Sequence, residues 1–262
     1  MATAHNPAID ALTGFRALAG RRVAVTGGTS GLGLALVREL TARGAQVAFV
    51  ARDRNRVECV AAETRAHGIV GDIASKTDVH AVALQILGLL GGLDVLVNNA
   101  SSLGPVPLRP LADTDCEDLE RALATNLVGP FRLTKALLGA LAASAREGRG
   151  AVVLNVSSDA AVNAYPGWGA YGASKAALAH LSRIWQVELD AQGVRFLSLD
   201  PGDMDTPLHA LAVPDADPAT LKPPSVSARE LVAAIEQGLR DPRSAQIAVP
   251  EACREAAEAR CP

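Results

Sequence analysis

Residues 22–33 read RVAVTGGTSGLG, a short apolar run followed directly by a glycine-rich turn. The apolar run is typical of a buried β-strand, and Leu32, Leu36 and Leu40 then recur at the spacing of one helix face. Glycines between a strand and a helix let a pyrophosphate approach the backbone, and the helix N-terminus supplies unpaired N–H groups. The stretch therefore predicts a dinucleotide-binding turn, with an ordinary glycine-rich turn as the alternative. The residues expected to contact the cofactor there are Gly27, Thr29, Ser30, Gly31, Leu32 and Gly33.

The rest of the chain repeats this alternation of short apolar runs and longer helical patterns. Further strands are expected at residues 46–51, 69–71, 93–98, 151–156, 194–199 and 245–249. Helices are expected at 54–67, 78–90, 171–191 and 228–239, with one long helix or two in tandem at 115–146 and a mobile loop at 205–225. Strands that alternate with helices predict βαβ units and a parallel sheet. We therefore expect one α/β domain at 21–262, after an N-terminal extension at 1–20. Its fold would be a doubly wound Rossmann fold, with about seven parallel strands and helices on both faces.

The composition indicates a soluble cytoplasmic protein. The 262 residues carry a net charge of -3, which argues against nucleic acid as a main partner because phosphate binding needs a basic surface. The cysteines, at positions 59, 116, 253 and 261, form no C-x-x-C pair, as in a cytosolic protein with free thiols. We expect no signal peptide, no membrane span and no metal site, since no stretch of about 20 residues is apolar throughout and a chain of this length needs no metal for stability.

The stretch YGASK at residues 171–175 opens a predicted helix and places Tyr171 and Lys175 on one helix face. Reduction of a carbonyl leaves an alkoxide that must gain a proton, and a free tyrosine, with a pKa of about 10, is a poor acid or base at neutral pH. A nearby ammonium stabilises the phenolate and lowers the pKa of the tyrosine. We therefore expect Tyr171 to give a proton in reduction, or to take one in oxidation.

Together these motifs resemble the short-chain dehydrogenase/reductase family, whose cofactor motif is Thr-Gly-x3-Gly-x-Gly, and the resemblance covers residues 21 to about 250. The resemblance implies a catalytic set of four residues. Ser158 matches the serine that polarises the substrate oxygen, with Ser157 as the competing candidate. Asn126 matches a residue whose carbonyl holds a water leading toward Lys175, and Lys175 would also reach the nicotinamide ribose. A mid-helix Asn is otherwise unfavourable, which suits a kink with a function.

The resemblance also favours NADP(H) over NAD(H) as the cofactor. In the family, an acidic residue at the last position of the second strand selects NAD, and that position is Ala51 here. A basic residue one position later pairs with the 2′-phosphate of NADP and matches Arg52. Asp53 is the conflicting feature, because a register error of one residue would make it the ribose ligand.

Further cofactor contacts are implied by three other matches. Asp72 matches the residue that meets the adenine amine, with a helix-capping Asp as the alternative. The family usually has Asn-Asn-Ala-Gly after the fourth strand, where this chain has Ser101 in place of the glycine, so we expect the loop beyond it to take a different backbone path. A Pro-Gly-x3-Thr motif follows the sixth strand and would pass the nicotinamide carboxamide and the pyrophosphate. The implied contacts, besides Tyr171 and Lys175, are Asp72, Ile73, Asn99, Ala100, Pro201, Gly202 and Thr206.

The substrate is expected to lie over the nicotinamide, between the loop after Ser101, the 159–170 loop and the 207–225 loop. The side chains that could line it are Leu103, Trp168, Met204, Leu208 and His209. The predicted function is NADP(H)-dependent hydride transfer between the nicotinamide and a small carbonyl compound or secondary alcohol, by a homodimer or homotetramer. The alternative is a non-catalytic NADP(H)-binding regulator or redox sensor, which would need the glycine turn but not the four catalytic residues.

Overall fold

Six parallel strands form the sheet in the described part of the chain, which is residues 18–240 of a computed structural model. In sheet order they are β3 (His67–Val70), β2 (Gln46–Ala51), β1 (Arg22–Thr26), β4 (Val95–Asn98), β5 (Ala151–Val156) and β6 (Val194–Leu199). The chain builds outward from β1 in one direction and from β4 in the other. In open α/β sheets this switch point is where ligands bind, beyond the carboxyl ends of the strands.

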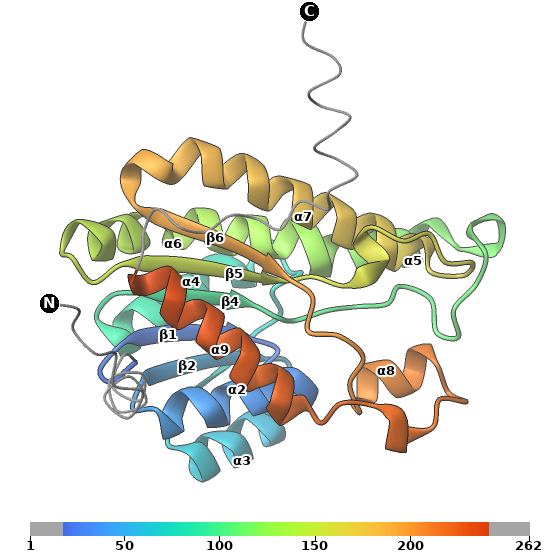
Figure 1. Cartoon of the computed structure of the whole chain (residues 1–262), viewed down its shortest axis with the longest axis horizontal. Helices are drawn as coiled ribbons and strands as arrows, with labels where there is room; N and C mark the ends of the chain where they lie inside the picture. Colours follow the sequence, from blue (N-terminus) through green and yellow to red (C-terminus); the bar gives the residue numbers. More distant parts are fainter. Residues whose placement is uncertain (1–17, 241–262) are drawn as a thin grey trace, which may run out of the picture.

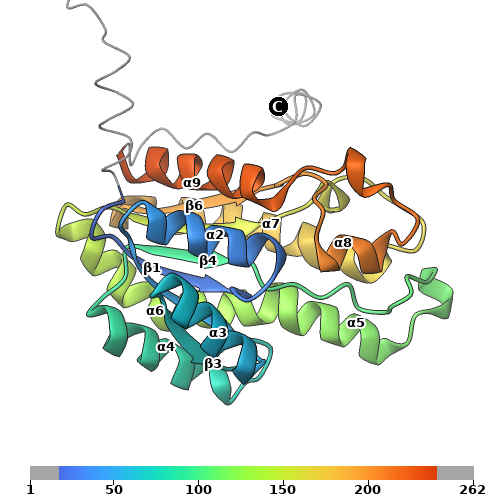
Figure 2. The same cartoon turned by 90° about the horizontal axis from the view of Figure 1, so that it is seen from below.

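Helices cover both faces of the sheet (Figures 1 and 2). One face carries α2 (Gly31–Ala42), α3 (Arg54–Thr64) and α9 (Pro224–Arg240). The other face carries α4 (Asp78–Leu90), α6 (Gly129–Arg146) and α7 (Gly169–Leu189). Two shorter helices, α5 (Cys116–Leu123) and α8 (Pro207–Ala212), lie toward the carboxyl ends of the strands in Figure 1.

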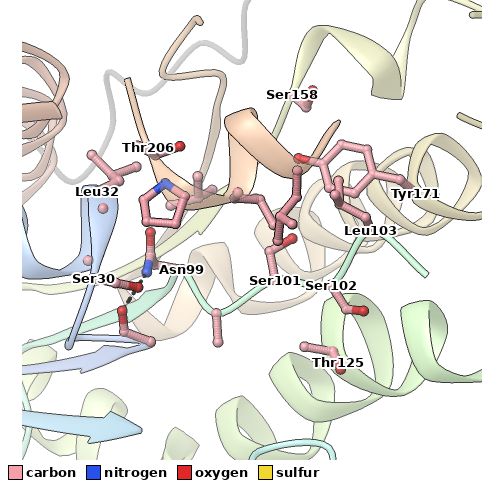
Figure 3. A pocket seen from close by; sticks show the side chains of 18 of the residues that line it. Ser30, Leu32, Asn99, Ser101, Ser102, Leu103, Thr125, Ser158, Tyr171 and Thr206 are labelled. Carbon is pink, nitrogen blue, oxygen red and sulfur yellow. Dashed lines mark hydrogen bonds between the residues drawn. The ribbon is translucent and has the colours of Figure 1, made fainter. Parts of the chain in front are cut away.

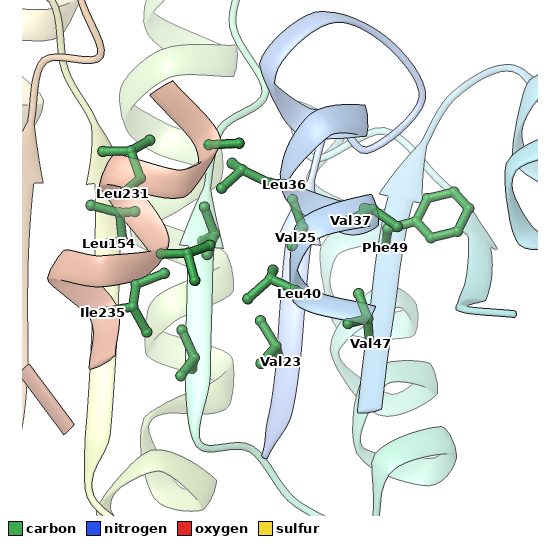
Figure 4. Packing of buried hydrophobic residues seen from close by; sticks show 14 of the residues in the cluster. Val23, Val25, Leu36, Val37, Leu40, Val47, Phe49, Leu154, Leu231 and Ile235 are labelled. Carbon is green, nitrogen blue, oxygen red and sulfur yellow. The ribbon is translucent and has the colours of Figure 1, made fainter. Parts of the chain in front are cut away.

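The strand residues alternate between the two faces, and both faces are apolar. Val23 and Val25 of β1 join the cluster under α2 and α9, whereas Ala24 joins the cluster on the opposite face. Figure 4 shows Leu36 and Leu40 of α2 above the first cluster. Burial on both faces explains why these strands appear in the sequence as nearly continuous apolar runs.

The doubly wound α/β fold predicted from the sequence is confirmed, and β1, β2, β5 and β6 have the predicted bounds. β4 begins at Val95 rather than at 93. α3 ends at Thr64 rather than at 67 because Arg65 takes a left-handed conformation with a φ of 60°, and β3 then begins at His67. The seventh strand, expected at 245–249, and most of the expected extension at 1–20 lie outside the described residues.

The segment predicted as a loop at 205–225 contains two short helices, which the sequence interpretation missed. They are α8 and η5 (Pro218–Thr220), and each has a proline in its first turn. The side chains of Thr206 and Asp217 accept hydrogen bonds from the first-turn N–H groups, as helix caps do. The Pro and Asp residues that suggested a loop are therefore the start signals of these helices.

At the amino end of the sheet, the buried carboxylate of Asp94 joins three segments. It accepts hydrogen bonds from Arg22 Nη2 at 2.6 Å, Arg149 Nη2 at 2.7 Å and Ser144 Oγ at 2.6 Å. Burial disfavours the charged form, but these donors outweigh it and hold the pKa of Asp94 well below its usual range. The cluster ties the start of β1 to the end of α6 and the turn before β5, at the opposite end of the strands from the switch point.

Candidate active site

A cleft of about 840 Å³ opens beyond the carboxyl ends of the strands. It brings together residues that the sequence analysis selected from seven separate segments, and Figure 3 shows part of its wall. Every predicted site residue except Asn126 lines it. These residues are Gly27, Thr29, Ser30, Gly31, Leu32, Gly33, Arg52, Asp72, Ile73, Asn99, Ala100, Ser158, Tyr171, Lys175, Pro201, Gly202 and Thr206.

The glycine-rich turn between β1 and α2 keeps its backbone open to a ligand. A Cβ at Gly33 would clash with the carbonyl oxygen of Gly27, and Gly27 itself has a φ of +71°. Glycine is therefore required at both positions, at Gly33 because there is no room for a side chain and at Gly27 because the backbone is left-handed. Ser30 is the N-cap residue of α2, yet its side chain makes no capping hydrogen bond. Its hydroxyl and the first N–H groups of α2 therefore face the cleft as donors, and this cradle fits a pyrophosphate.

The loop after β4 is fastened to this turn by hydrogen bonds between side chains and backbone. Thr26 Oγ1 accepts hydrogen bonds from the N–H groups of Asn99 at 3.0 Å and Ala100 at 3.1 Å. The Asn99 amide in turn donates to the Thr26 carbonyl oxygen at 2.9 Å. On the other side of the turn, Thr206 lies close to Gly31, since a Cβ there would come within 3.2 Å of the threonine methyl group. The two edges of the cleft are thus held at a fixed separation across the switch point.

Three residues after β2 line the cleft, namely Arg52, Asp53 and Arg56, and Asp53 also caps a helix. Asp53 Oδ1 accepts a hydrogen bond from the Arg56 N–H at 3.1 Å and so caps α3. Arg52 is exposed and lines the cleft, and Arg56 also lines it from the first turn of α3. Sequence reasoning missed Arg56, although its place in the first turn of a helix that follows the cofactor-selecting strand was visible.

Asp72 lies in the cleft wall and does not cap a helix, since the N-cap residue of α4 is Thr77. One of its carboxylate oxygens accepts a hydrogen bond from the Ala74 N–H at 2.9 Å, which is a local turn contact. The side chain also lines the cleft beside Ile73, which is buried against the core. The local contact therefore does not remove Asp72 from the cleft.

Tyr171 and Lys175 lie in the first turns of α7, and both are almost fully buried. Lys175 Nζ donates a hydrogen bond to the Val156 carbonyl oxygen at 2.8 Å and lies 5.6 Å from the centre of the Tyr171 ring. Burial lowers the pKa of Lys175 to about 8, although the nearby carboxylate of Asp200 opposes the shift. This ammonium is therefore poorly solvated, and two of its three protons remain for other acceptors.

The expected lowering of the Tyr171 pKa is wrong for this structure. Burial raises the pKa of Tyr171 above its ordinary value, and the nearby hydroxyl groups of Ser158 and Ser101 offset only part of that rise. The physical reason is that desolvation of the phenolate dominates, while the Lys175 ammonium is itself desolvated and bonded to a backbone carbonyl. The spacing of the two residues could not show how deeply both are buried.

The two candidate serines after β5 have different surroundings. Ser158 accepts a hydrogen bond from the Ala160 N–H at 3.2 Å and donates to Asp159 Oδ1 at 3.1 Å, and its hydroxyl is near enough to Tyr171 to lower the pKa of the phenol. Asp159 is held in turn by the Tyr165 hydroxyl at 2.7 Å. Ser157 lines the cleft too, but its N–H extends the sheet by bonding to Leu199. The geometry thus favours Ser158 as the serine next to Tyr171.

Asn126 lies in a π-helical turn, η2 (Ala124–Val128), which joins α5 to α6 and explains the two helices in tandem. Its side chain is fully buried and lies behind the cleft wall. The amide nitrogen donates to the Ser102 carbonyl oxygen at 2.7 Å and to Ser174 Oγ at 2.8 Å. The amide oxygen accepts from the Ser102 N–H at 2.8 Å and from Ser101 Oγ at 3.2 Å. Asn126 therefore holds the loop after β4 against α7.

The substrate end of the cleft is apolar. Leu103 and Tyr171 form a small cluster against which Trp168 and Leu208 pack. The Trp168 ring lies edge-on to the Tyr171 ring, with 5.7 Å between the ring centres. The five side chains predicted to line this end, including Met204 and His209, all line the cleft.

In the described residues, 18–240, no helix is both long and apolar enough to cross a membrane.

Comparisons with known proteins agree with this geometry. The family model for short chain dehydrogenases matches residues 21–217. The 2,5-dichloro-2,5-cyclohexadiene-1,4-diol dehydrogenase of Sphingobium indicum is 35% identical over 193 residues, which cover 73% of this chain and 75% of that protein.

Solved structures are similar over most of their length. A short chain dehydrogenase from Burkholderia cenocepacia J2315 in complex with NADP has a TM-score of 0.74 at 26% identity, over 83% of this chain and 91% of that one. The 3-ketoacyl-(acyl-carrier-protein) reductase from Brucella melitensis, complexed with NADH, has a TM-score of 0.78 at 27% identity, over 88% and 94% of the two chains. With its glycine-rich turn and its Tyr171–Lys175 pair in one cleft, the chain belongs to the short-chain dehydrogenase/reductase family of oxidoreductases.

Proposed function

We propose that this chain transfers a hydride between NADP(H) and a carbonyl compound or the corresponding secondary alcohol. The observation that carries the proposal is the meeting of Tyr171, Lys175 and Ser158 in the same cleft as the pyrophosphate-sized glycine cradle. When bound, the nicotinamide cofactor supplies or accepts the hydride. Tyr171 gives its proton to the alkoxide oxygen in reduction and recovers a proton in oxidation, while Ser158 donates a hydrogen bond to the same oxygen.

The cofactor would be held by groups spread along the cleft. The glycine cradle would take the pyrophosphate, Asp72 and Ile73 would border the adenine, and the residues after β4 and β6 would border the nicotinamide. The two protons of Lys175 Nζ that do not bond to Val156 would hold the nicotinamide ribose. Arg52 and Arg56 provide the positive charge that a 2′-phosphate requires.

NADP(H) is preferred over NAD(H) in this proposal because two arginines, Arg52 and Arg56, line the cleft beside Asp53, the one acidic residue among them. Asp53 caps α3 and pairs with Arg56 at 3.7 Å, so its carboxylate is engaged with its own helix. Arg52 makes no ion pair with any residue in the described range and projects into the cleft. One of the similar structures holds NADP and another holds NADH. The cofactor preference proposed for this chain therefore rests on its own residues after β2.

Arg52→Ala is expected to weaken NADPH binding by about 10- to 100-fold, the equivalent of one hydrogen-bonded charge pair, and to leave NADH binding nearly unchanged. Both dissociation constants can be measured by titrating the fluorescence of the reduced nicotinamide. Arg54→Ala is the matched control, because the Arg54 side chain is 71% exposed and lies outside the cleft wall. Equal losses for the two cofactors in Arg52→Ala would refute the assignment.

The substrate that fits best is a small, mainly apolar carbonyl compound. Leu103, Trp168 and Leu208 surround the Tyr171 ring, and α8 adds further apolar side chains from across the cleft. A polyhydroxylated sugar would leave its hydroxyl groups unpaired against this wall, which costs affinity.

The test of the proposed function is consumption of reduced cofactor by the purified protein over a panel of ketones, aldehydes and 3-oxoacyl thioesters. NADPH and NADH are supplied separately, and absorbance reports the reduced nicotinamide. Turnover with NADPH on apolar ketones supports the proposal. Tight NADPH binding without turnover on any member of the panel would favour the non-catalytic regulator instead.

We also propose that the protein works as a homo-oligomer in the cytoplasm. Helices α6 and α7 lie side by side, joined by the stacked rings of Phe131 and Trp185. Their outer surface exposes Phe131, Ile184 and Val187, the last with 81% of its surface accessible. Large apolar side chains exposed on neighbouring helices are what a protein interface would cover. The exposed free thiols of Cys59 and Cys116 suit a reducing compartment.

Val187→Asp is expected to reduce the mass of the protein in solution to that of the monomer, because a carboxylate at the centre of the interface would be buried without a partner. Light scattering after size-exclusion chromatography measures the mass directly. Leu84→Asp on α4 is the control, since Leu84 is similarly exposed at 72% on another helix. An unchanged mass for Val187→Asp would show that α7 does not form the interface.

A further inference from the structure

The apolar wall at the substrate end of the cleft begins at the reacting tyrosine. Leu103, from the loop after β4, is buried beside the Tyr171 ring, as Figure 3 shows. Leu208 of α8 packs against the same cluster. We call Leu103 and Leu208 the inner pair. A carbonyl group that takes a proton from Tyr171 therefore lies where apolar side chains of these two segments meet.

Two further apolar side chains continue this wall toward solvent. Val106 follows Leu103 by three residues, and Leu211 follows Leu208 by three residues on the same face of α8. Both side chains line the cleft, and each is 51% exposed. We call Val106 and Leu211 the outer pair. The apolar wall thus runs from buried side chains at Tyr171 to half-exposed ones at the mouth of the cleft.

Their place in the cleft sets the outer pair apart from other exposed apolar side chains. Such side chains are common on protein surfaces and by themselves need no explanation. Among the large apolar side chains that are exposed in residues 18–240, however, Val106 and Leu211 are the two that line the cleft. An apolar group bound between them would remove their exposed area from water, which favours its binding.

The charged side chains that line this end of the cleft already have polar partners within the described part of the chain. The pairs are Arg121 with Asp118, Asp159 with the Tyr165 hydroxyl, Asp200 with the Gly202 N–H, and Asp203 with His209. None of these side chains therefore requires an opposite charge on the substrate. The lining that remains for the substrate beyond its reacting end is the apolar wall.

We propose that the carbonyl compound taken by this cleft carries an apolar chain on one side of its carbonyl group. The carbonyl group lies at Tyr171, and the chain runs along the inner pair and leaves the cleft between Val106 and Leu211. A chain fits better than a compact apolar group, because the wall extends outward from Tyr171 instead of closing over it. Such a substrate presupposes the hydride transfer proposed above, since its carbonyl end must reach Tyr171.

The first test is the turnover of straight-chain methyl ketones, from butanone to decanone, with saturating NADPH. The value of kcat/KM is expected to rise about fourfold for each methylene buried at the inner pair. At the outer pair the rise should be about twofold for each methylene, because half of the surface there stays in water. A kcat/KM that does not change along the series would overturn the proposal.

The second test changes the outer pair. Leu211→Asn and Val106→Thr keep the approximate size of the side chains but replace apolar surface by polar groups. Each is expected to lower the ratio of kcat/KM for decanone to that for butanone by about threefold to tenfold. A ratio that equals the wild-type value in both variants would contradict a chain between these two residues.

The same two substitutions at other exposed apolar positions are the matched controls. Val162→Thr and Leu84→Asn change side chains that are 75% and 72% exposed and lie outside the cleft wall, so the wild-type ratio is expected. Light scattering gives the mass of each variant in solution. A lower mass for Leu211→Asn or Val106→Thr would show that a second copy of the chain covers the outer pair, and it would overturn the proposal.

Binding of straight-chain carboxamides separates this inference from the proposed function, because an amide carbonyl resists hydride transfer. Calorimetry on the series from butanamide to decanamide should show the affinity rising by the same factors as kcat/KM. Turnover of butanone, without dependence on chain length in either series, would refute the apolar chain alone. Amide affinity that rises with chain length, without turnover of any ketone, would refute the reductase function and leave the wall as a binding site for an apolar chain.

Discussion

Tyr171→Phe is expected to lower kcat/KM for carbonyl reduction by about 10²- to 10⁴-fold, the range for loss of a positioned proton donor. Phenylalanine keeps the ring contacts with Trp168 and Leu103 but has no proton to give. The affinity for NADPH should change little, since the glycine cradle and Arg52 are untouched. Initial rates and a fluorescence titration of NADPH on the same preparation measure the two effects separately.

The other tyrosine of the chain provides the control. Tyr165 is 43% exposed, lies outside the cleft wall, and bonds to Asp159 rather than to the reacting centre. Tyr165→Phe should therefore lose far less activity than Tyr171→Phe. A Tyr171→Phe variant that keeps most of its activity would show that another group supplies the proton.

Asp94→Asn is expected to lower the free energy of unfolding by about 3 kcal/mol at neutral pH. The asparagine has nearly the same shape but leaves Arg22 and Arg149 without the carboxylate that both of them contact. The estimate is at the low end for a broken buried pair because both arginines are partly exposed. Urea unfolding followed by circular dichroism measures the loss.

The same cluster predicts a pH dependence with a definite sign. The pKa of Asp94 is lower in the folded protein than in the unfolded chain, so its stabilisation is complete above the unfolded pKa of about 4. It is lost progressively as the pH falls below that value. The difference in stability between wild type and Asp94→Asn should therefore shrink in acid. Glu63→Gln, which breaks the exposed pair with Arg38, should show a much smaller effect at every pH. A constant difference between wild type and Asp94→Asn down to low pH would contradict this account.

The sheet could be predicted because its strands are buried on both faces, which gives unmistakable apolar runs such as that of β1. The glycine turn and the Tyr171–Lys175 pair could be predicted because their chemistry fixes the spacing. The two helices between 205 and 225 were missed because their caps and prolines have the composition of a loop. The local sequence pattern alone does not distinguish a short capped helix from a loop.

Other features depend on tertiary contacts that no local pattern contains. The raised pKa of Tyr171 follows from burial beneath three separate loops. The hydrogen bond from Ser101 to Asn126 joins the loop after β4 to the π-helical turn in which Asn126 lies, and the sequence gives no sign of that turn. The sequence left open whether Asp53 contacts the ribose, because a shift of one residue in the match to the family motif changes its predicted role. The structure shows that it caps α3.

The most direct test of the central claim is to follow the hydride. NADPH with both hydrogens at the nicotinamide C4 position replaced by deuterium is supplied with the best ketone of the panel, and the product alcohol is analysed by mass spectrometry and NMR. The proposed function predicts one deuterium on the carbinol carbon of each product molecule. A product without deuterium, or no product from any carbonyl despite tight NADPH binding, would contradict it.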